Sequence, residues 1–259
     1  MKKIMTALLV ASSLGVYAEL SVDEIVKKAN EASYYAGKDG KAEVEMKIID
    51  KSGSSRTREF TLLRMNTDNG NQKFYVYFKK PADIYKQVFM VWKEVGEGNS
   101  DSRWMWLPAL NLSKQIAPGD KRTSFVGSDF VYEDVSGRNL KEDNHELTET
   151  TDTQYVIKNT PKDAGSVEFS YYTVRIDKET FLPRKAEYFD KNGKHYRTVE
   201  ATKVETIQGF PTVIESVVKD LNTGGSTVNT FSNVKYDIGL KENIFTERFL
   251  RRPPREVTR

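Results

Sequence analysis

The sequence contains no cysteine and only two histidines, which restricts the disulfides, catalytic sites and metal sites that it could form. Without cysteine, disulfides cannot stabilise the fold, and neither thiol catalysis nor thiolate metal sites are possible. His145 and His195 lie in charged stretches outside any His-Glu-x-x-His zinc helix. Gly127-Ser128-Asp129 also departs from the Gly-x-Ser-x-Gly nucleophile motif. We therefore expect no catalytic residues, no metal site and no cofactor.

Long apolar runs are scarce as well, and the one that is present begins the chain. Two lysines precede the mostly apolar run Ile4–Val16, and Val16-Tyr17-Ala18 places small residues at the −3 and −1 positions of a cleavage site. This pattern predicts a Sec signal peptide over residues 1–18, because the run is too short for a comfortable membrane span. No cysteine follows that could carry a lipid anchor. We expect an exported, soluble protein whose residues 19–259 form one domain, with a core large enough to be stable without disulfides.

Excess charge of one sign is missing too. Removal of the signal peptide with its two lysines lowers the formal charge from +3 to +1, so we expect no nucleic-acid binding. The exception is a basic C-terminal tail that contains Arg248, Arg251, Arg252, Arg255 and Arg259. We interpret this tail as a solvated, frayed terminus. The alternative is a docking contact with an acidic partner or with lipid headgroups.

The hydrophobic pattern predicts one helix followed by many strands. Ser21 and Glu24 form a capping-box pattern, and apolar residues at helical spacing extend the helix over Val22–Tyr35. Period-two alternation and turn residues then predict an antiparallel meander. Its strands are expected at 42–48, 58–65, 72–80, 88–92, 154–159, 167–177, 183–190, 194–204, 212–219 and 227–236.

Two of these strands, 74–78 and 88–92, are apolar on both faces, which requires cover on both sides or an apolar cavity on one. The predicted fold class is therefore mainly β (α+β). We expect a large unclosed antiparallel β-barrel, or strongly curved sheet, around an apolar cavity. The N-terminal helix, a helical lid loop and the Trp-rich stretch after residue 102 would cover its concave side.

The aromatic and methionine side chains of the middle region are the candidate ligand-binding residues. Trp104 and Trp106 would share one face of a short strand, with Met105 and Leu107 on the other. Such residues serve either as core or as adaptable cavity lining, and both interpretations stay open. The predicted cavity lining comprises Phe74, Val76, Phe78, Met90, Trp92, Trp104 and Trp106, and the predicted lid or rim comprises Phe125, Phe130 and Tyr132.

Three carboxylates, Asp129, Glu133 and Asp134, form the remaining cluster of interest. They suit either a calcium site or acid/base pair, or a structured loop in which they pair with Lys121, Arg122 or Arg138 or cap a helical turn. Because their spacing matches no oxygen-ligand loop, we favour the structural interpretation.

Several segments together resemble the LolA-like family of outer-membrane lipoprotein-sorting proteins, the superfamily that also includes LolB and LppX. These are Arg103-Trp104-Met105-Trp106-Leu107-Pro108, the stretch 114–122, Ser124–Asp134 and the C-terminal 245–250. The resemblance covers essentially the whole mature chain. It implies an unclosed antiparallel β-barrel with an apolar cavity, in a periplasmic protein of outer membrane biogenesis that carries lipids or lipoprotein acyl chains.

The resulting hypothesis is a non-enzymatic monomeric carrier that binds acyl chains and ferries them between membranes. A lid built from Val22–Tyr35 and Leu107–Asp134 would open to admit the chains. The alternative is an accessory substrate-binding or docking protein of an inner-membrane transporter of the RND/MMPL type, a partner that the family resemblance implies.

Overall fold

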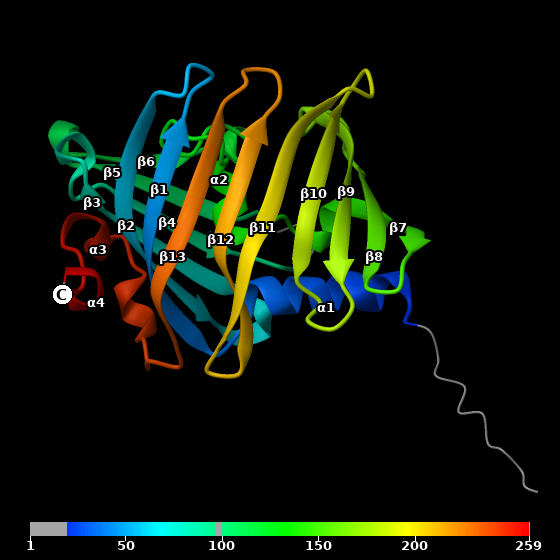
Figure 1. Ribbon diagram of the computed structural model, residues 1–259. Coiled ribbons are helices and arrows are strands. Elements are labelled where there is room, and N and C mark those ends of the chain that lie inside the picture. Colours follow the sequence, from blue (N-terminus) through cyan, green and yellow to red (C-terminus); the bar gives the residue numbers. More distant parts are fainter. Residues whose placement is uncertain (1–19, 97–99, 259) are drawn as a thin grey trace, which may run out of the picture.

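A computed structural model describes residues 20–96 and 100–258 of the chain. The predicted signal peptide and Arg259 lie outside these ranges. The described residues contain no helix that is both long and apolar enough to span a membrane. They form one thirteen-stranded antiparallel sheet accompanied by short helices (Figure 1).

The strands follow one another along the chain in two runs. The first run is β1 (Asp39–Ile49), β2 (Ser55–Asn66), β3 (Gln72–Lys80), β4 (Val88–Lys93), β5 (Ser102–Leu107) and β6 (Leu112–Ile116). The second run is β7 (Asp143–Thr150), β8 (Gln154–Pro161), β9 (Phe169–Asp177), β10 (Pro183–Asp190), β11 (His195–Ile207), β12 (Phe210–Asp220) and β13 (Ser226–Tyr236). The α-helices are α1 (Val22–Tyr34), α2 (Tyr132–Ser136), α3 (Arg248–Arg251) and α4 (Arg255–Thr258).

The strand order β6-β5-β4-β3-β2-β1-β13-β12-β11-β10-β9-β8-β7 places the start of the meander in the centre of the sheet. From β1 the chain runs outward to one edge, β6. The segment 117–142, which we call the crossing segment, then crosses to the other edge, β7. From there the chain returns to β13, which pairs with β1. The two edges do not pair with each other, so the predicted unclosed, curved antiparallel sheet is confirmed.

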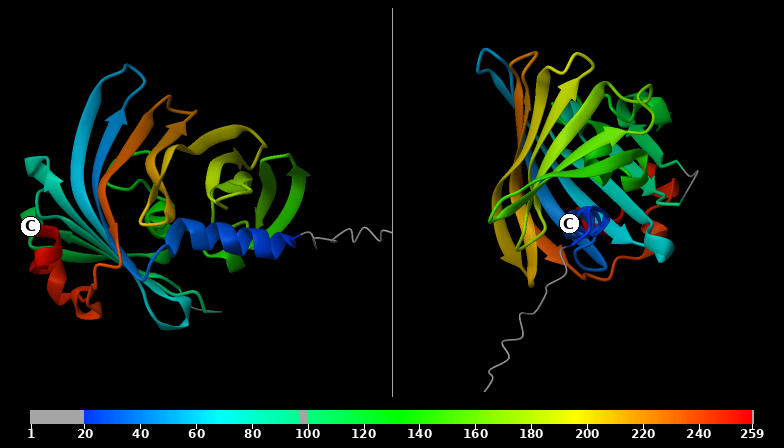
Figure 2. Two further views of the ribbon diagram at one scale, coloured as in Figure 1. Left: turned by 60° about the horizontal axis from the view of Figure 1, so that its bottom comes forward. Right: turned by 90° about the vertical axis from the view of Figure 1, so that its right-hand side faces the viewer.

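Helix α1 begins where the capping box predicts. The Ser21 N–H donates to Glu24 Oε2 over 2.8 Å, and the Glu24 N–H donates to Ser21 Oγ over 3.3 Å. Ile25, which is fully buried, packs with Ile157 of β8 and Ile176 of β9. Helix α1 thus lies on the concave side of the sheet near its β7 edge (Figure 2), with its apolar stripe packed on β8 and β9.

The two faces of the sheet are covered by different parts of the chain. Helix α1 and the segment 117–142 lie on the concave side, whereas α3 and α4 lie on the opposite side, outside β2–β5 (Figure 2). Residues alternate between these environments along β3–β5. Phe74, Val76, Phe89 and Met105 join the core on the concave side. Tyr75, Tyr77, Met90 and Trp106 join the core beneath residues 240–258, which we call the C-terminal segment. This double cover explains the strands that are apolar on both faces.

Candidate functional site

The concave side holds a cavity of about 470 Å³ with mainly apolar walls, which we call the apolar cavity. Its lining comes from three parts of the fold that are distant in sequence. The sheet contributes Met46, Phe60, Phe74, Val76, Val199, Val213 and Phe231; α1 contributes Val26, Ala29 and Ala32; and the crossing segment contributes Phe125, Phe130 and Val135. Concave sites of this size with mainly apolar walls are typical of small-molecule binding.

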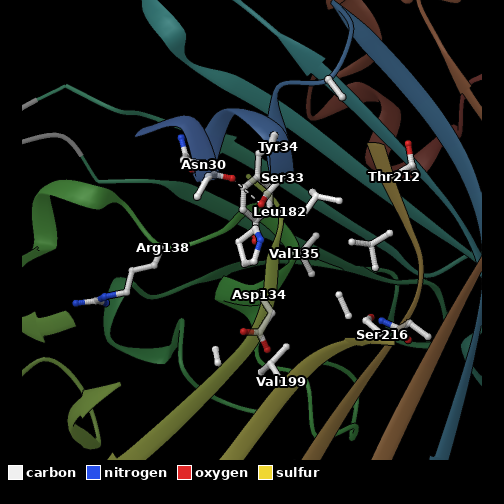
Figure 3. Close-up of a pocket in the computed structure, with 18 of the residues that line it drawn as sticks. Asn30, Ser33, Tyr34, Asp134, Val135, Arg138, Leu182, Val199, Thr212 and Ser216 are labelled. Carbon is white, nitrogen blue, oxygen red and sulfur yellow. Dashed lines mark hydrogen bonds between the residues drawn. The ribbon is translucent and has the colours of Figure 1, made fainter. Parts of the chain in front are cut away.

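The close-up of the cavity shows how these parts face one another. Ser33 and Tyr34 of α1 lie on one side, and Val199 of β11 lies on the other (Figure 3). Asp134 and Val135, from the crossing segment, lie between them (Figure 3). The cavity is therefore bounded by the sheet, the helix and the crossing segment together.

The crossing segment is anchored by an aromatic side chain and does not lie loosely over the cavity. Phe125 is 1% exposed, and its ring centroid lies 5.3 Å from that of Phe89 and 5.9 Å from that of Phe78. Tyr132 contacts both Phe89 and Phe125, at centroid distances of 5.1 and 5.6 Å. These contacts fix the middle of the segment against β3 and β4.

A buried ionic network fixes the same segment from its other side. The carboxylate of Glu133, which is 2% exposed, lies 3.1 Å from Lys121 Nζ, 3.1 Å from Arg122 Nη1 and 3.3 Å from Arg138 Nη1. Burial alone would raise the pKa of Glu133, but the three cations outweigh it and hold the pKa below its usual value. Arg138 also donates from Nε to Asp143 Oδ2 over 2.9 Å, which ties the segment to β7.

The other two acids have structural partners as well. Asp134 Oδ2 accepts the Val131 N–H over 2.7 Å, capping α2, and also pairs with Arg197 of β11. Asp129 Oδ2 accepts the Thr227 hydroxyl of β13 over 2.6 Å. Glu133 thus pairs with the three predicted cations and Asp134 caps a helical turn, as the structural interpretation expects, while the partner of Asp129 is a strand hydroxyl.

Four of the ten predicted site residues line the apolar cavity: Phe74, Val76, Phe125 and Phe130. Phe78 and Tyr132 lie in the adjoining core, where both contact Phe125. The prediction is wrong for Met90, Trp92, Trp104 and Trp106, which lie on the opposite face of the sheet beneath the C-terminal segment.

Strand register explains this error. Val76 of β3 pairs with Phe89 of β4, which pairs with Met105 of β5, so these three face the cavity side. Trp104 and Trp106 flank Met105 and must point the other way. The two tryptophans do share a face, as predicted, but that face is not the concave one.

The C-terminal segment covers the tryptophan face, so the prediction of a frayed tail is also wrong. Val257 and Leu250 are 0% exposed. The Trp92 Nε1–H donates to the Phe245 carbonyl and the Tyr75 hydroxyl donates to the Phe249 carbonyl, each over 2.7 Å. Apolar burial outweighs the charge of the tail, while Arg248, Arg251, Arg252 and Arg255 stay at the surface.

The sequence interpretation missed the cavity lining that comes from α1 and the second half of the sheet. Ala29 and Ala32 lie on the inner stripe of α1, and Val199 and Phe231 lie on the inner faces of β11 and β13. The helical periodicity of α1 and the alternation along β11 and β13 could have identified these inward-facing residues. His145 lines the cavity too, with Nδ1 2.7 Å from Asn159 Oδ1 and Nε2 2.9 Å from the Leu140 carbonyl oxygen.

A second cavity of about 1090 Å³ adjoins the first, and we call it the polar cavity. Its lining includes Lys27, Glu31, Asn71, Lys93, Glu94 and Lys141. The two cavities share the lining residues Asn30, Ala32, Ala36, Arg138, Leu140 and Pro211. Charged side chains therefore lie beside the apolar cavity at the C-terminal half of α1, in a neighbouring cavity whose wall is otherwise largely apolar.

Comparison with known proteins places this geometry in context. A family model described as an uncharacterized protein matches residues 70–252. No curated protein matches the chain. Among solved structures, a DUF1329 family protein from Desulfovibrio piger is 27% identical, with a TM-score of 0.80 over 88% of this chain and 97% of that one.

Two further solved structures share the architecture. A protein from Vibrio parahaemolyticus described as an outer membrane lipoprotein-sorting domain is 25% identical, with a TM-score of 0.80 over 88% of this chain and 97% of that one. A LolA superfamily protein from Nitrosomonas europaea is 19% identical, with a TM-score of 0.68 over 89% of this chain and 100% of that one. The fold is therefore LolA-like.

Proposed function

We propose that this protein carries acyl chains. The chain belongs to the family, described as an uncharacterized protein, whose model matches residues 70–252, and its fold is LolA-like. The cargo is a lipid or a lipoprotein, and the site is the apolar cavity. The lipoprotein-sorting description of the Vibrio parahaemolyticus protein supports this assignment. The proposal places the protein in the periplasm, where it binds its cargo without chemically changing it and ferries it between membranes.

The observation that carries the proposal is the apolar wall of the cavity. Each buried methylene contributes about 0.8 kcal/mol, so about ten methylenes contribute about 8 kcal/mol, which corresponds to a micromolar Kd before the costs of binding. Phe60, Phe74, Phe130 and Phe231 offer such a surface without any polar contact to the chain. Binding of this kind fits a carrier, since it requires no covalent chemistry.

We propose that a boundary of the cavity moves during loading, and α1 is the better candidate for that movement. The crossing segment is fixed by Phe125 in the core and by Glu133 in the ionic network. Helix α1 makes fewer ionic ties and rests mainly on the apolar contacts of Ile25, Val26 and Ala29. We therefore propose that α1 moves while most of the Leu107–Asp134 part of the expected lid stays in place.

Filling the cavity tests the carrier function directly. Ala201 lines the cavity, whereas its neighbour Thr202 is exposed. We expect Ala201→Trp to abolish saturable binding of a fluorescent fatty acid and Thr202→Trp to leave it intact. Equal binding by both variants contradicts the proposal. Tryptophan emission of the wild type is a poor readout here, because Trp92, Trp104 and Trp106 lie on the other face.

Native mass spectrometry of the protein purified from its own cell envelope would identify the cargo. We expect a bound species whose mass matches a lipid or an acylated peptide, and we expect Ala201→Trp to lose it. Recovery of only unliganded protein, together with no saturable acyl binding, would count against a carrier.

The fixed C-terminal segment favours a second candidate function, that of an accessory docking protein for an inner-membrane transporter of the RND/MMPL type. It holds exposed arginines, among them Arg252 and Arg255, on a rigid base. Arg252→Glu with Arg255→Glu tests this function without unpacking Val257. Loss of transport in cells with acyl binding retained favours docking, and unchanged transport argues against it.

A further inference from the structure

Lys93 is a buried cation at the boundary between the helix and the crossing segment. It lies at the end of β4, is 2% exposed and lines the polar cavity. Its Nζ donates to the Ser136 carbonyl over 2.6 Å and lies 5.1 Å from the centre of the Tyr34 ring. Tyr34 in turn lines the apolar cavity, so Lys93 lies next to the junction of the two compartments.

The ammonium group of Lys93 has donors to spare. A lysine ammonium carries three N–H donors, and only one of them has a hydrogen-bond acceptor among the described residues. The adjacent Ser136 hydroxyl is 0% exposed and likewise lacks a partner there. Buried donors without acceptors are costly, so the pair provides a place for an incoming acceptor.

The carboxylates around Lys93 are already committed to other cations. Asp101 lies 2.6 Å from Arg103 Nη2, Glu133 is shared by Lys121, Arg122 and Arg138, and Glu142 lies 2.6 Å from both Lys121 and Arg138. No carboxylate of residues 20–96 or 100–258 forms an ion pair with Lys93. Burial lowers the pKa of Lys93 to about 8, so the side chain is still mostly charged at pH 7.

The rest of the polar cavity suits an anionic group near Lys93. Lys27 and Lys141 add positive charge to the lining. Of the two acids there, Glu94 accepts the Asn71 side-chain amide over 2.8 Å, and Glu31 lies 3.9 Å from Lys27. Arg138, at the shared boundary, has its guanidinium occupied by acids, and Lys27 and Lys141 are exposed, so among the described residues that line the polar cavity Lys93 is the buried cation with free donors.

We propose that Lys93, with the Ser136 hydroxyl beside it, binds the anionic head group of an amphiphile whose acyl chain occupies the apolar cavity. The head group is a phosphate or a carboxylate. This inference rests on the proposed carrier function and narrows its cargo to negatively charged lipids. Charge-assisted hydrogen bonds at a buried ammonium would discriminate against a neutral head group of the same chain length.

Competition for a neutral fluorescent acyl probe tests the preference. The ligands are dodecyl phosphate, laurate and 1-dodecanol, each below its aggregation threshold. We expect the wild type to bind the two anions at least about tenfold more tightly than the alcohol, as one hydrogen bond to a charged group provides. In Lys93→Met that ratio should fall to about one, while Lys235→Met, an exposed lysine on β13, should keep it.

Binding measured at two pH values tests whether the charge of Lys93, and not only the shape of the site, causes the preference for anions. Laurate stays ionised at pH 7.5 and pH 9.5, whereas Lys93 loses its proton between them. The wild-type preference for laurate over dodecanol should therefore shrink at the higher pH, and Lys93→Met should show no such change. Thermal unfolding of each variant confirms that the fold is intact.

The possible outcomes are distinct. Equal binding of the anions and the alcohol by the wild type overturns the head-group assignment and leaves the carrier function standing. Binding of none of the three ligands refutes the carrier function and this inference with it. If inorganic phosphate alone competes as well as dodecyl phosphate, the site binds a free anion and the lipid assignment is wrong.

Discussion

Substitution of Glu133 by glutamine should destabilise the whole protein, because it removes the one carboxylate that Lys121, Arg122 and Arg138 share. Glu133 is 2% exposed, so water cannot reach the site to solvate the cations that lose this carboxylate. Breaking a buried ion pair by removal of one partner costs about 3–5 kcal/mol. For a domain of this size each kcal/mol lowers Tm by about 2–4 °C, which predicts a loss of about 6–20 °C.

Urea unfolding followed by far-UV circular dichroism, with calorimetry for Tm, measures this loss. Glu149→Gln is the matched control, since Glu149 is exposed on β7 and should change stability by no more than about 0.5 kcal/mol. A loss below about 1 kcal/mol for Glu133→Gln would refute the view that this network holds the crossing segment in place.

Acid titration gives the same prediction a second readout. The cations hold the folded-state pKa of Glu133 below its reference value of 4.5, so its stabilisation is fully present above pH 4.5 and is lost as the pH falls through the folded-state pKa. Wild-type stability should therefore fall below about pH 4.5, and Glu133→Gln should show a shallower decline.

Three further substitutions probe the covers on the two faces. Ser21→Ala removes the N-cap of α1, should cost about 0.5–2 kcal/mol, and should speed acyl-probe release in stopped-flow if α1 is the moving wall; unchanged release would argue against helix movement. Trp92→Phe removes the donor to the Phe245 carbonyl, should cost about 1 kcal/mol in urea unfolding, and should increase proteolysis of the C-terminal segment. Leu250→Ala, at a fully buried position, should cost about 2–5 kcal/mol by the same assay, and a smaller loss would mean that the segment packs weakly.

The interior strands were predictable because each buries side chains against two neighbouring strands. Gln72–Lys80 was predicted with both of its ends correct, and the capping box located the start of α1. Both strands that the sequence pattern missed, β6 and β7, are the edges of the sheet. An edge strand has one neighbour and much exposed surface, so its hydrophobic alternation is weak, as in the mostly exposed β6.

The direction in which each face points could not be read from alternation. Alternation places Trp104 and Trp106 together and Met105 opposite, but it cannot say which face is concave when both are apolar. Which face is concave could be decided only from the packing of the C-terminal segment. Its many arginines suggested an exposed tail, whereas its Ile244, Leu250 and Val257 pack on the tryptophan face. The exposed arginines of such a segment therefore do not indicate whether its other side is buried against the sheet.

The strand order has a consequence for how the protein must fold. Every strand pairing except β1 with β13 joins neighbours in sequence, so two half-sheets, β1–β6 and β7–β13, can each grow by local hairpins. The β1–β13 contact pairs Ile49 with Ser226 and has to close a loop that contains most of the chain. We expect this closure to be the slow step. Until it occurs, the aromatic inner faces of both halves stay open to aggregation, and the acyl-binding compartment is formed only when the halves join.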